Sequence, residues 1–512
     1  MTVSNICILG TIAVYLVGML IIGFRCARKN ESSADFYLGG RKLGPLVTAM
    51  SAEASDMSSY LLMGLPGLAY LSGVADVGWT AIGLAVGTYL NWLFTALRLR
   101  RYTQETGSTI PQFFSRRFRD DKNILAVLAA VIIIIFFIPY TASGFAACGK
   151  LFSSLFGMNY MTAMIISAVV IVAYTTAGGF FAASATDFVQ SIIMTVAIVF
   201  VLVFSTISAG GIDAVVENAK ALPGYLSLTA SYIEDTGKSE PYNLLHIITT
   251  LSWGLGYFGM PHILLRFMAI EDEKKLKLSR RVASIWVVIA MAMAVLIGIV
   301  GRALSNTGLV DQLHGNDTET IIVRVAHLLS TYGAFPAIMA GLILAGILAS
   351  TMSTADSQLL AAASSVSENI LREAFHLKIS EKKSMLAARL TVIGIAILGI
   401  IIARNPDSSV FGIVSFAWAG FGAAFGPLVI CSLFWKRTTL PGAIVGMVSG
   451  GAMVFIWKYL IKPIGGVFGI YELLPAFLVG LVLMVIVSLC TKAPSKEITD
   501  EFDRVKAMGK AK

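Results

Sequence analysis

Apolar segments long enough to cross a lipid bilayer recur along this chain from one end to the other. The 512 residues are 56% hydrophobic and 13% charged, and no soluble domain of this length needs so much apolar surface. No loop or tail is long enough for a separate soluble domain, so we expect one membrane domain over residues 1–512. Since a spanning helix takes about 20 apolar residues, the sequence predicts an all-α integral membrane protein with about thirteen transmembrane helices, at roughly 5–24, 44–71, 74–97, 123–153, 159–177, 185–209, 243–266, 282–303, 332–368, 386–403, 410–434, 439–461 and 468–490.

Lysine and arginine are distributed unevenly between alternate loops. About 30 of the 39 basic residues fall on one side, which the positive-inside rule assigns to the cytoplasm. We therefore expect a multi-pass protein of the cell membrane with its N-terminus outside and its C-terminus in the cytoplasm. The net charge of +9 follows from these loops and their apposition to anionic lipid. It gives no reason to expect nucleic acid as a partner, and we infer no obligate protein partner.

Two carboxylates lie near the middle of the second apolar segment. Glu53 and Asp56 stand inside residues 45–71, where a charge in hydrocarbon is costly and is by default a functional group. Small residues surround Asp56, and Gly64-Leu65-Pro66-Gly67 follows, a combination typical of a helix that breaks and offers free backbone carbonyls. Broken helices at membrane depth occur only where they line a protein-enclosed cavity. Asp56 is therefore a candidate for an ion or substrate path.

Hydroxyl groups are concentrated in the apolar segment near residue 350. Ser350, Ser353, Thr354 and Ser357 follow one another at spacings of three and four, which places them on one face of a helix. Hydroxyls can act simply as polar glue between helices. A site for a hard cation is the alternative, and oxygen ligands without a carboxylate cage suit sodium better than calcium or zinc.

A third unusual segment is rich in glycine. Gly254, Gly256, Gly259 and Pro261 within eight residues predict an interruption of the spanning helix at about mid-depth. This break lies some 200 residues after the first, and paired interrupted helices are typical of an inverted-repeat transporter with its site between them. We expect the repeats at about 43–208 and 243–404, with peripheral helices at about 5–24, 439–461 and 468–490.

Three aromatic residues and one acid complete the set of candidates. Tyr140 follows an internal proline in the fourth apolar segment, and a packed aromatic side chain is the simpler interpretation of it alone. Trp253 and Tyr257 are expected to share one helical face and could enclose a small ring together with Tyr140. Asp187 stands near the start of the sixth segment, where an interfacial cap and a functional acid are both open.

Other classes of protein find little support in the sequence. The five cysteines and five histidines are scattered without metal-ligand spacing, and there is no Walker-type loop or paired acid and base at enzyme-like spacing. We therefore expect a transporter and not an enzyme. An ion channel remains a second alternative, because intramembrane Asp and hydroxyl groups also line pores.

Several long motifs in order along nearly the whole chain give a specific resemblance. The chain resembles the sodium:solute symporter family, most closely its proline-transporting branch. The motifs are Asp35-Phe36-Tyr37-Leu38-Gly39-Gly40-Arg41, Ala54-Ser55-Asp56-Met57-Ser58, Leu61-Leu62-Met63-Gly64-Leu65-Pro66-Gly67, Trp253-Gly254-Leu255-Gly256-Tyr257-Phe258-Gly259, Pro261-His262-Ile263, Met352-Ser353-Thr354 and Ala417-Trp418-Ala419-Gly420-Phe421-Gly422-Ala423-Ala424-Phe425-Gly426-Pro427.

The resemblance implies a fold, a cargo and two sets of residues. It implies a LeuT-like 5+5 inverted repeat with one extra helix before it and two after it, and sodium-coupled uptake of L-proline; another small organic solute is the alternative cargo. The implied sodium site uses carbonyls of Ala54, Met57 and Ser350 and hydroxyls of Ser353 and Thr354, with Asp56 in support. The implied proline site is lined by Ser58, Tyr140, Trp253, Tyr257 and Pro261. The chain departs from the branch at Glu53, Ser59, Thr141 and Met260.

Overall fold

Long helices dominate the computed structural model, which describes residues 2–27, 37–104, 109–375 and 380–508. Within these ranges, ten helices are long and apolar enough to cross a membrane. They correspond to α1 (Val3–Ala27), α5 with α6 (Val74–Leu90, Ala96–Tyr102), α8 (Ile124–Phe156), the second part of α9 (Tyr160–Ser208), α13 (Leu276–Asn306), α15 (Ala334–Ser364), α16 (Glu381–Ile402), α17 (Val410–Phe434), α18 (Leu440–Ile456) and α19 (Leu473–Cys490). The chain is therefore an α-helical, multi-pass membrane protein.

The three remaining predicted segments are helical but interrupted or short. The segment predicted at 44–71 forms α3 (Pro45–Ser59) and α4 (Leu65–Ser72), and the one at 243–266 forms α11 (Leu244–Leu251) and α12 (Pro261–Ala269). The segment predicted at 159–177 is the first part of α9, which bends at Gly179, where φ is +68°. The ten continuous helices and these three interrupted or short segments account for every predicted segment within the described residues. That all thirteen cross the membrane remains a prediction.

Short elements connect the long helices. Two strands form an antiparallel hairpin in which Ala230 pairs with Pro241 and Ile233 with Lys238. Part of one predicted motif, Asp35-Phe36, lies outside the described residues. The short elements are α7 (Ile110–Arg117), α10 (Ile212–Ala221), β1 (Ala230–Ile233), β2 (Lys238–Pro241), α14 (Ile321–Ser330) and α20 (Lys496–Ala507).

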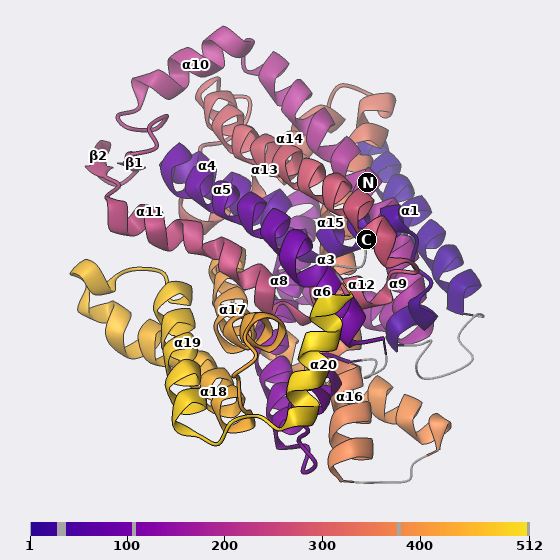
Figure 1. Ribbon diagram of the computed structural model, residues 1–512. Helices are drawn as coiled ribbons and strands as arrows, with labels where there is room; N and C mark the ends of the chain where they lie inside the picture. The colour runs from indigo at the N-terminus through magenta and orange to yellow at the C-terminus, as the bar shows by residue number, and fades with distance from the viewer. Residues whose placement is uncertain (1, 28–36, 105–108, 376–379, 509–512) are drawn as a thin grey trace.

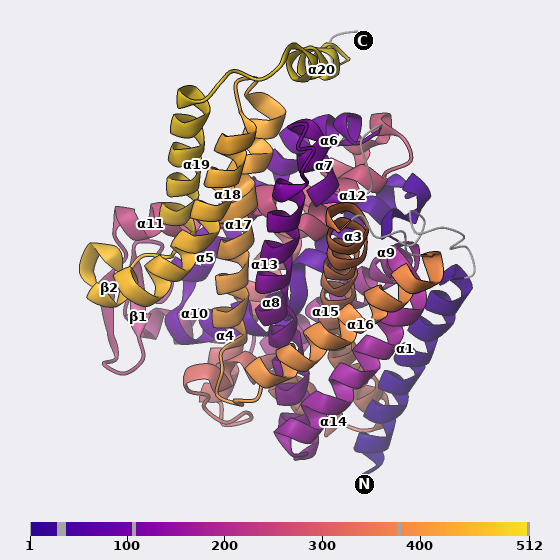
Figure 2. The same ribbon diagram turned by 90° about the horizontal axis from the view of Figure 1, so that it is seen from below.

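The helices form a bundle whose centre is occupied by α3 and α15. Figure 1 shows this pair between α1 and α9 on one side and α17, α18 and α19 on the other. In Figure 2 the start of α1 and α14 lie at one end of the bundle, and α6, α7 and α20 lie at the opposite end. Large apolar side chains such as Val14, Ile207 and Leu390 are more than half exposed on the outside. An apolar outer surface of this kind suits contact with lipid.

The centre of the bundle is unusually polar for such an apolar chain. Every residue from Thr48 to Ser59 is buried, as is every residue from Ile343 to Ser364. These two runs contain Glu53, Asp56 and Asp356, as well as the hydroxyl groups singled out above. Because buried polar groups are kept only when they are partnered or functional, this central pair is the place to look for the site.

Candidate functional site

The backbone of α3 breaks at Ser58. This residue has φ +48° and ψ −168°, a conformation that is rare and strained for a residue with a Cβ. Its hydroxyl accepts a hydrogen bond from the Tyr60 amide at 3.1 Å, and a wide π-type turn over Tyr60–Gly64 leads into α4. The predicted first break is confirmed, and it lies directly after Asp56 and Met57.

The hydroxyl face of α15 meets α3 just before this break. Ser353 Oγ donates to the Ala54 carbonyl at 2.8 Å and lies 3.2 Å from the Ser350 carbonyl. Thr354 Oγ1 donates to the same Ser350 carbonyl at 3.1 Å. Four of the six residues predicted for sodium, Ala54, Ser350, Ser353 and Thr354, are thus linked by hydrogen bonds between their oxygen atoms. The arrangement joins residues that are about 300 positions apart in the sequence.

Asp56 and Met57 face the other side of α3. Tyr257 donates from its hydroxyl to Asp56 Oδ2 at 2.5 Å, and Tyr140 donates to the Asp56 backbone carbonyl at 3.3 Å. Asp56 Oδ1 is buried without a hydrogen-bond partner among the described residues. An acceptor-only oxygen in this position can serve a cation or an ammonium group. The Met57 side chain lines an adjoining cavity.

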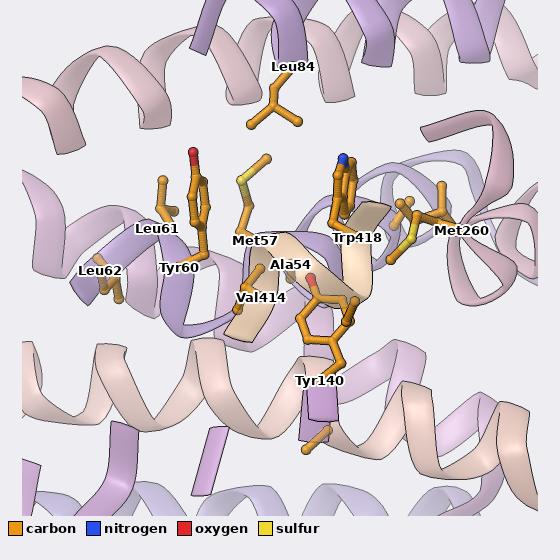
Figure 3. Close-up of a cluster of buried hydrophobic side chains, with 14 of the residues drawn as sticks. Ala54, Met57, Tyr60, Leu61, Leu62, Leu84, Tyr140, Met260, Val414 and Trp418 are labelled. Atoms are coloured by element: carbon orange, nitrogen blue, oxygen red, sulfur yellow. The ribbon is translucent and has the colours of Figure 1, made fainter. Parts of the chain in front are cut away.

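That cavity lies between α3, α5, α8, α13 and α17, next to the second break. It is small, with about 10 Å³ open to the centre of a water molecule. Figure 3 shows Met57, Tyr60 and Trp418 pointing toward Leu84, while Tyr140 approaches from the opposite helix. The lining residues are Asp56, Met57, Tyr60, Leu84, Tyr140, Trp253, Met291, Val414 and Trp418.

Aromatic rings form one wall of this cavity. The Trp253 ring stacks on Tyr60 and on Tyr471, with centroids 5.6 and 4.9 Å apart. Trp418 donates from Nε1 to the Trp253 carbonyl at 2.8 Å and meets the Tyr257 ring edge-on at 5.1 Å. Offset and edge-to-face pairs of this type hold the rings rigidly. These rings therefore give the cavity a closely packed apolar wall.

The second predicted break is present, with one correction. Residues Ser252–Gly259 form a 3-10 helix, in which side chains four positions apart point in directions about 120° apart. The prediction that Trp253 and Tyr257 share one face assumed an α-helix and is wrong. Trp253 lines the cavity, whereas Tyr257 reaches Asp56. Pro261, the first residue of α12, is buried but lines neither this cavity nor the one that contains Ser58.

Asp187 is buried at the centre of the bundle. Its side chain is fully buried and pairs with Arg266 at 3.1 Å, and Ser51 Oγ donates to its Oδ2 at 2.7 Å. The alternative of an interfacial cap is therefore wrong. Arg266 also donates to the Ser357 hydroxyl and to the His262 carbonyl, so it ties α12 to α3, α9 and α15. Removing one partner of such a buried pair is costly.

The four positions that the sequence analysis singled out as departures from the branch, Glu53, Ser59, Thr141 and Met260, are all buried. Glu53 accepts a hydrogen bond from Trp92 Nε1 at 3.1 Å, and Met260 is fully buried where α12 begins. Ser59 and Thr141 line a second small cavity together with Ser58 and Tyr140. Their polar groups therefore lie beside the predicted substrate residues.

Sequence reasoning missed several residues that hold the site together. Trp418 was noted only as part of a glycine-rich motif, although its ring contacts both Trp253 and Tyr257. Arg266 drew no attention, because a basic residue at the end of an apolar segment resembles an ordinary cytoplasmic flank. Asn91, which donates to the Tyr257 carbonyl at 2.9 Å, carried no local signal at all.

Solved structures show which fold this arrangement represents. A sodium-coupled sialic acid symporter in a substrate-bound outward-open state is similar over 97% of this chain and 99% of its own, with a TM-score of 0.76 and 18% identity. Mhp1, a nucleobase-cation-symport-1 family transporter, is similar over 93% of this chain and 99% of its own, with a TM-score of 0.55 and 15% identity. At these identities the likeness shows the fold alone, which is that of LeuT-like transporters.

Sequence relatives are closer. The sodium/proline symporter of Escherichia coli (strain K12) is 40% identical over 499 residues, which cover 96% of this chain and 95% of the relative. The osmoregulated proline transporter OpuE of Bacillus subtilis (strain 168) is 40% identical over 488 residues, 95% of each chain. The model of the sodium:solute symporter family matches residues 36–450. The chain, a secondary transporter and not an enzyme, belongs to the sodium:solute symporter family.

Proposed function

We propose that this protein carries L-proline into the cell together with sodium by alternating access. The observation that carries the proposal is the contact of the broken helix α3 with the hydroxyl face of α15, where Ser353 Oγ lies 2.8 Å from the Ala54 carbonyl. The relatives that are 40% identical over nearly the full length are named as proline transporters. The family is sodium-coupled by its description.

The proposed sodium site lies at this contact. Its ligands are the carbonyls of Ala54, Met57 and Ser350 and the hydroxyls of Ser353 and Thr354, with the charge of Asp56 nearby. The donor set fits the ion, because it consists of neutral oxygen atoms and one adjacent carboxylate, which suits a monovalent hard cation. The hydrogen bonds from Ser353 to the Ala54 carbonyl and from Thr354 to the Ser350 carbonyl support the proposal for these four residues.

The proposed proline site lies beside it, across α3. Trp253 supplies an apolar wall, Tyr140 and Tyr257 supply hydroxyls that reach Asp56, and Ser58 and Pro261 mark the two interrupted backbones. Proline has a compact ring, a carboxylate and a secondary ammonium, and a site for it needs an apolar wall with a few placed polar groups. The cavity next to Asp56 combines both.

Coupling follows from the proximity of the two sites on one broken helix. If sodium at α3 and α15 favours the state that binds proline, linkage requires proline to tighten sodium by the same factor. One sodium ion moving through about 100 mV yields roughly 2.3 kcal/mol, and a tenfold sodium gradient adds about 1.4 kcal/mol. At one-to-one coupling the sum supports accumulation of several hundredfold.

The architecture that we propose around the sites has thirteen spans. The inverted repeats cover about 43–208 and 243–404, and the helices at about 5–24, 439–461 and 468–490 are peripheral. We place the protein in the cell membrane with the N-terminus outside and the C-terminus in the cytoplasm. The opposite positions of the start of α1 and of α20 in Figure 2 support this placement, as does the bias of the basic loops.

A competition experiment distinguishes proline from another small solute. Purified protein in sodium buffer is incubated with radiolabelled proline and with excess unlabelled proline, pantothenate, a sugar or an aromatic amino acid. We expect only unlabelled proline and closely related five-membered-ring imino acids to displace the label. Displacement by pantothenate or a sugar, with no effect of proline, would overturn the cargo while leaving a sodium-coupled transporter in place.

A further inference from the structure

The cavity that contains Ser59 and Thr141 is a polar alcove on the other side of Tyr140. We define the polar alcove by its lining residues, which come from α3, α8 and α15. It has about 10 Å³ open to the centre of a water molecule, enough for one oxygen atom with its hydrogen. The lining residues are Ser58, Ser59, Tyr140, Thr141, Ser143, Gly144, Thr351, Thr354, Ala355 and Gln358.

Two groups in the polar alcove are buried without a partner. Gln358 is fully buried, and its Nε2, which carries two N–H donors, has no hydrogen-bond partner among the described residues. Ser59 is fully buried as well, and its Oγ is likewise unpartnered there. Thr141 Oγ1 donates to Gln358 Oε1 at 3.3 Å and so fixes which end of the amide is free to donate. A buried donor left unpaired is costly.

Three other hydroxyls of the polar alcove already donate hydrogen bonds. Ser143 donates to the Tyr140 carbonyl at 2.6 Å, Thr351 to the Ile347 carbonyl at 3.0 Å and Thr354 to the Ser350 carbonyl at 3.1 Å. Among the described residues that line the alcove, the buried side-chain atoms without a partner are Gln358 Nε2 and Ser59 Oγ. An amide with two free N–H groups requires an acceptor, and a serine hydroxyl can both donate and accept.

We propose that the polar alcove receives a hydroxyl group on the ring of the substrate, so that hydroxylated proline is also a cargo. The inference rests on the proposed function, since it needs the proline ring beside Tyr140. Tyr140 lines both the aromatic cavity and the polar alcove, so a ring packed against Trp253 and Trp418 lies next to the hydroxyl-lined side. In this arrangement the substrate hydroxyl accepts a hydrogen bond from Gln358 Nε2 and donates one to Ser59 Oγ.

Ser59, Thr141 and Gln358 are then specificity-determining residues. A pocket that hydrogen-bonds a substrate hydroxyl discriminates strongly in its favour, because the pocket's own polar groups are unpaired without it.

The test is the ratio of 4-hydroxy-L-proline uptake to proline uptake in proteoliposomes with an inward sodium gradient, for both the cis and the trans isomer. We expect at least one isomer to be carried at least as well as proline. Ser59→Ala and Gln358→Met should each lower the ratio about tenfold or more while proline uptake persists. Thr351→Val is the matched control, since Thr351 lines the same alcove but its hydroxyl donates to the Ile347 carbonyl. The ratio of hydroxyproline to proline uptake should stay unchanged in this variant.

Each outcome separates the inference from the proposed function. Proline uptake with neither hydroxyproline isomer carried would overturn the alcove as a hydroxyl site and leave proline transport intact, as expected if it holds water only. Equal loss of both substrates in all three variants would make the alcove structural, which also overturns the inference. Absence of sodium-driven proline uptake in the unmodified protein would instead contradict the proposed function itself.

Discussion

Ser353 and Thr354 place two hydroxyl groups against backbone carbonyls in the buried centre of the bundle. Their hydroxyls reach carbonyls of α3 and α15, and the spacing of the hydroxyl face made this predictable. The partner of Asp187 was not predictable in the same way. Arg266 lies 79 positions further along the chain, and only the folding of α12 against α9 brings the two together. Local patterns identify a polar face, whereas the tertiary structure decides what it faces.

At this scale the first prediction concerns sodium. Thr354→Ala removes a proposed ligand oxygen, and Asp56→Asn removes a charge that favours a bound cation. Both should raise the sodium concentration for half-maximal proline uptake several-fold or more, with normal expression. Ser364→Ala on the same helix is the control, since its hydroxyl only bonds the Ala361 carbonyl. Unchanged sodium dependence in both site variants would contradict the sodium site and leave these hydroxyls with a role in helix packing alone.

The second prediction concerns the substrate. Tyr140→Phe, Trp253→Ala and Tyr257→Ala should each weaken proline binding, by roughly 1–3 kcal/mol for a lost buried polar partner. Sodium binding measured without proline should change much less. Isothermal titration or scintillation proximity binding gives both values on one preparation. A loss confined to sodium binding would contradict the assignment of these aromatic residues to proline.

The buried ion pair gives a third residue-scale prediction. Asp187→Asn leaves Arg266 unpaired and should destabilise the protein by about 3–5 kcal/mol, seen as a lower midpoint of thermal unfolding in detergent. Replacing both residues, as Asp187→Asn with Arg266→Met, should recover part of the loss because neither member of the pair is then left as a buried charge without the other. A double variant as unstable as the sum of the single ones would show that the pair is not coupled.

At the scale of elements, glycine sets how closely α5 approaches the second break. A Cβ added at Gly87 would lie 2.4 Å from Gly254 Cα, and one added at Gly256 would lie 2.0 Å from Trp418 Nε1. The interruption itself was predictable from the density of glycine and proline. Its 3-10 winding was not, because that winding follows from packing against α5 and α17, and it moved Tyr257 off the face of Trp253.

These contacts predict a strong effect of small substitutions. Gly87→Ala should disrupt the packing of α5 on residues 252–259 and lower both the thermal midpoint and proline uptake. Gly18→Ala in α1, where nothing lies within 4 Å of the added Cβ, should be neutral or stabilising by a few tenths of a kcal/mol, up to about 1 kcal/mol. Equal behaviour of the two variants would mean that the close approach is not needed.

At the scale of the whole molecule, composition and the basic loops predicted the membrane fold without reference to any contact. They could not fix the crossings, because three of the predicted segments are broken or short. Single cysteines at Lys238 and Lys275 in a cysteine-free background test the topology, since both side chains are exposed. An impermeant reagent should label them from opposite sides; labelling from one side would contradict the thirteen-span arrangement.

The central claim is that proline uptake is coupled to sodium bound where α3 meets α15. Radiolabelled proline uptake into proteoliposomes, with and without an inward sodium gradient, tests it most directly. We predict transient accumulation above equilibrium when the gradient is present, larger when the inside is made negative. Accumulation should vanish when sodium is equal on both sides without a membrane potential. Accumulation that is the same with and without the sodium gradient, or no proline uptake by protein that is folded and correctly inserted, would contradict the account.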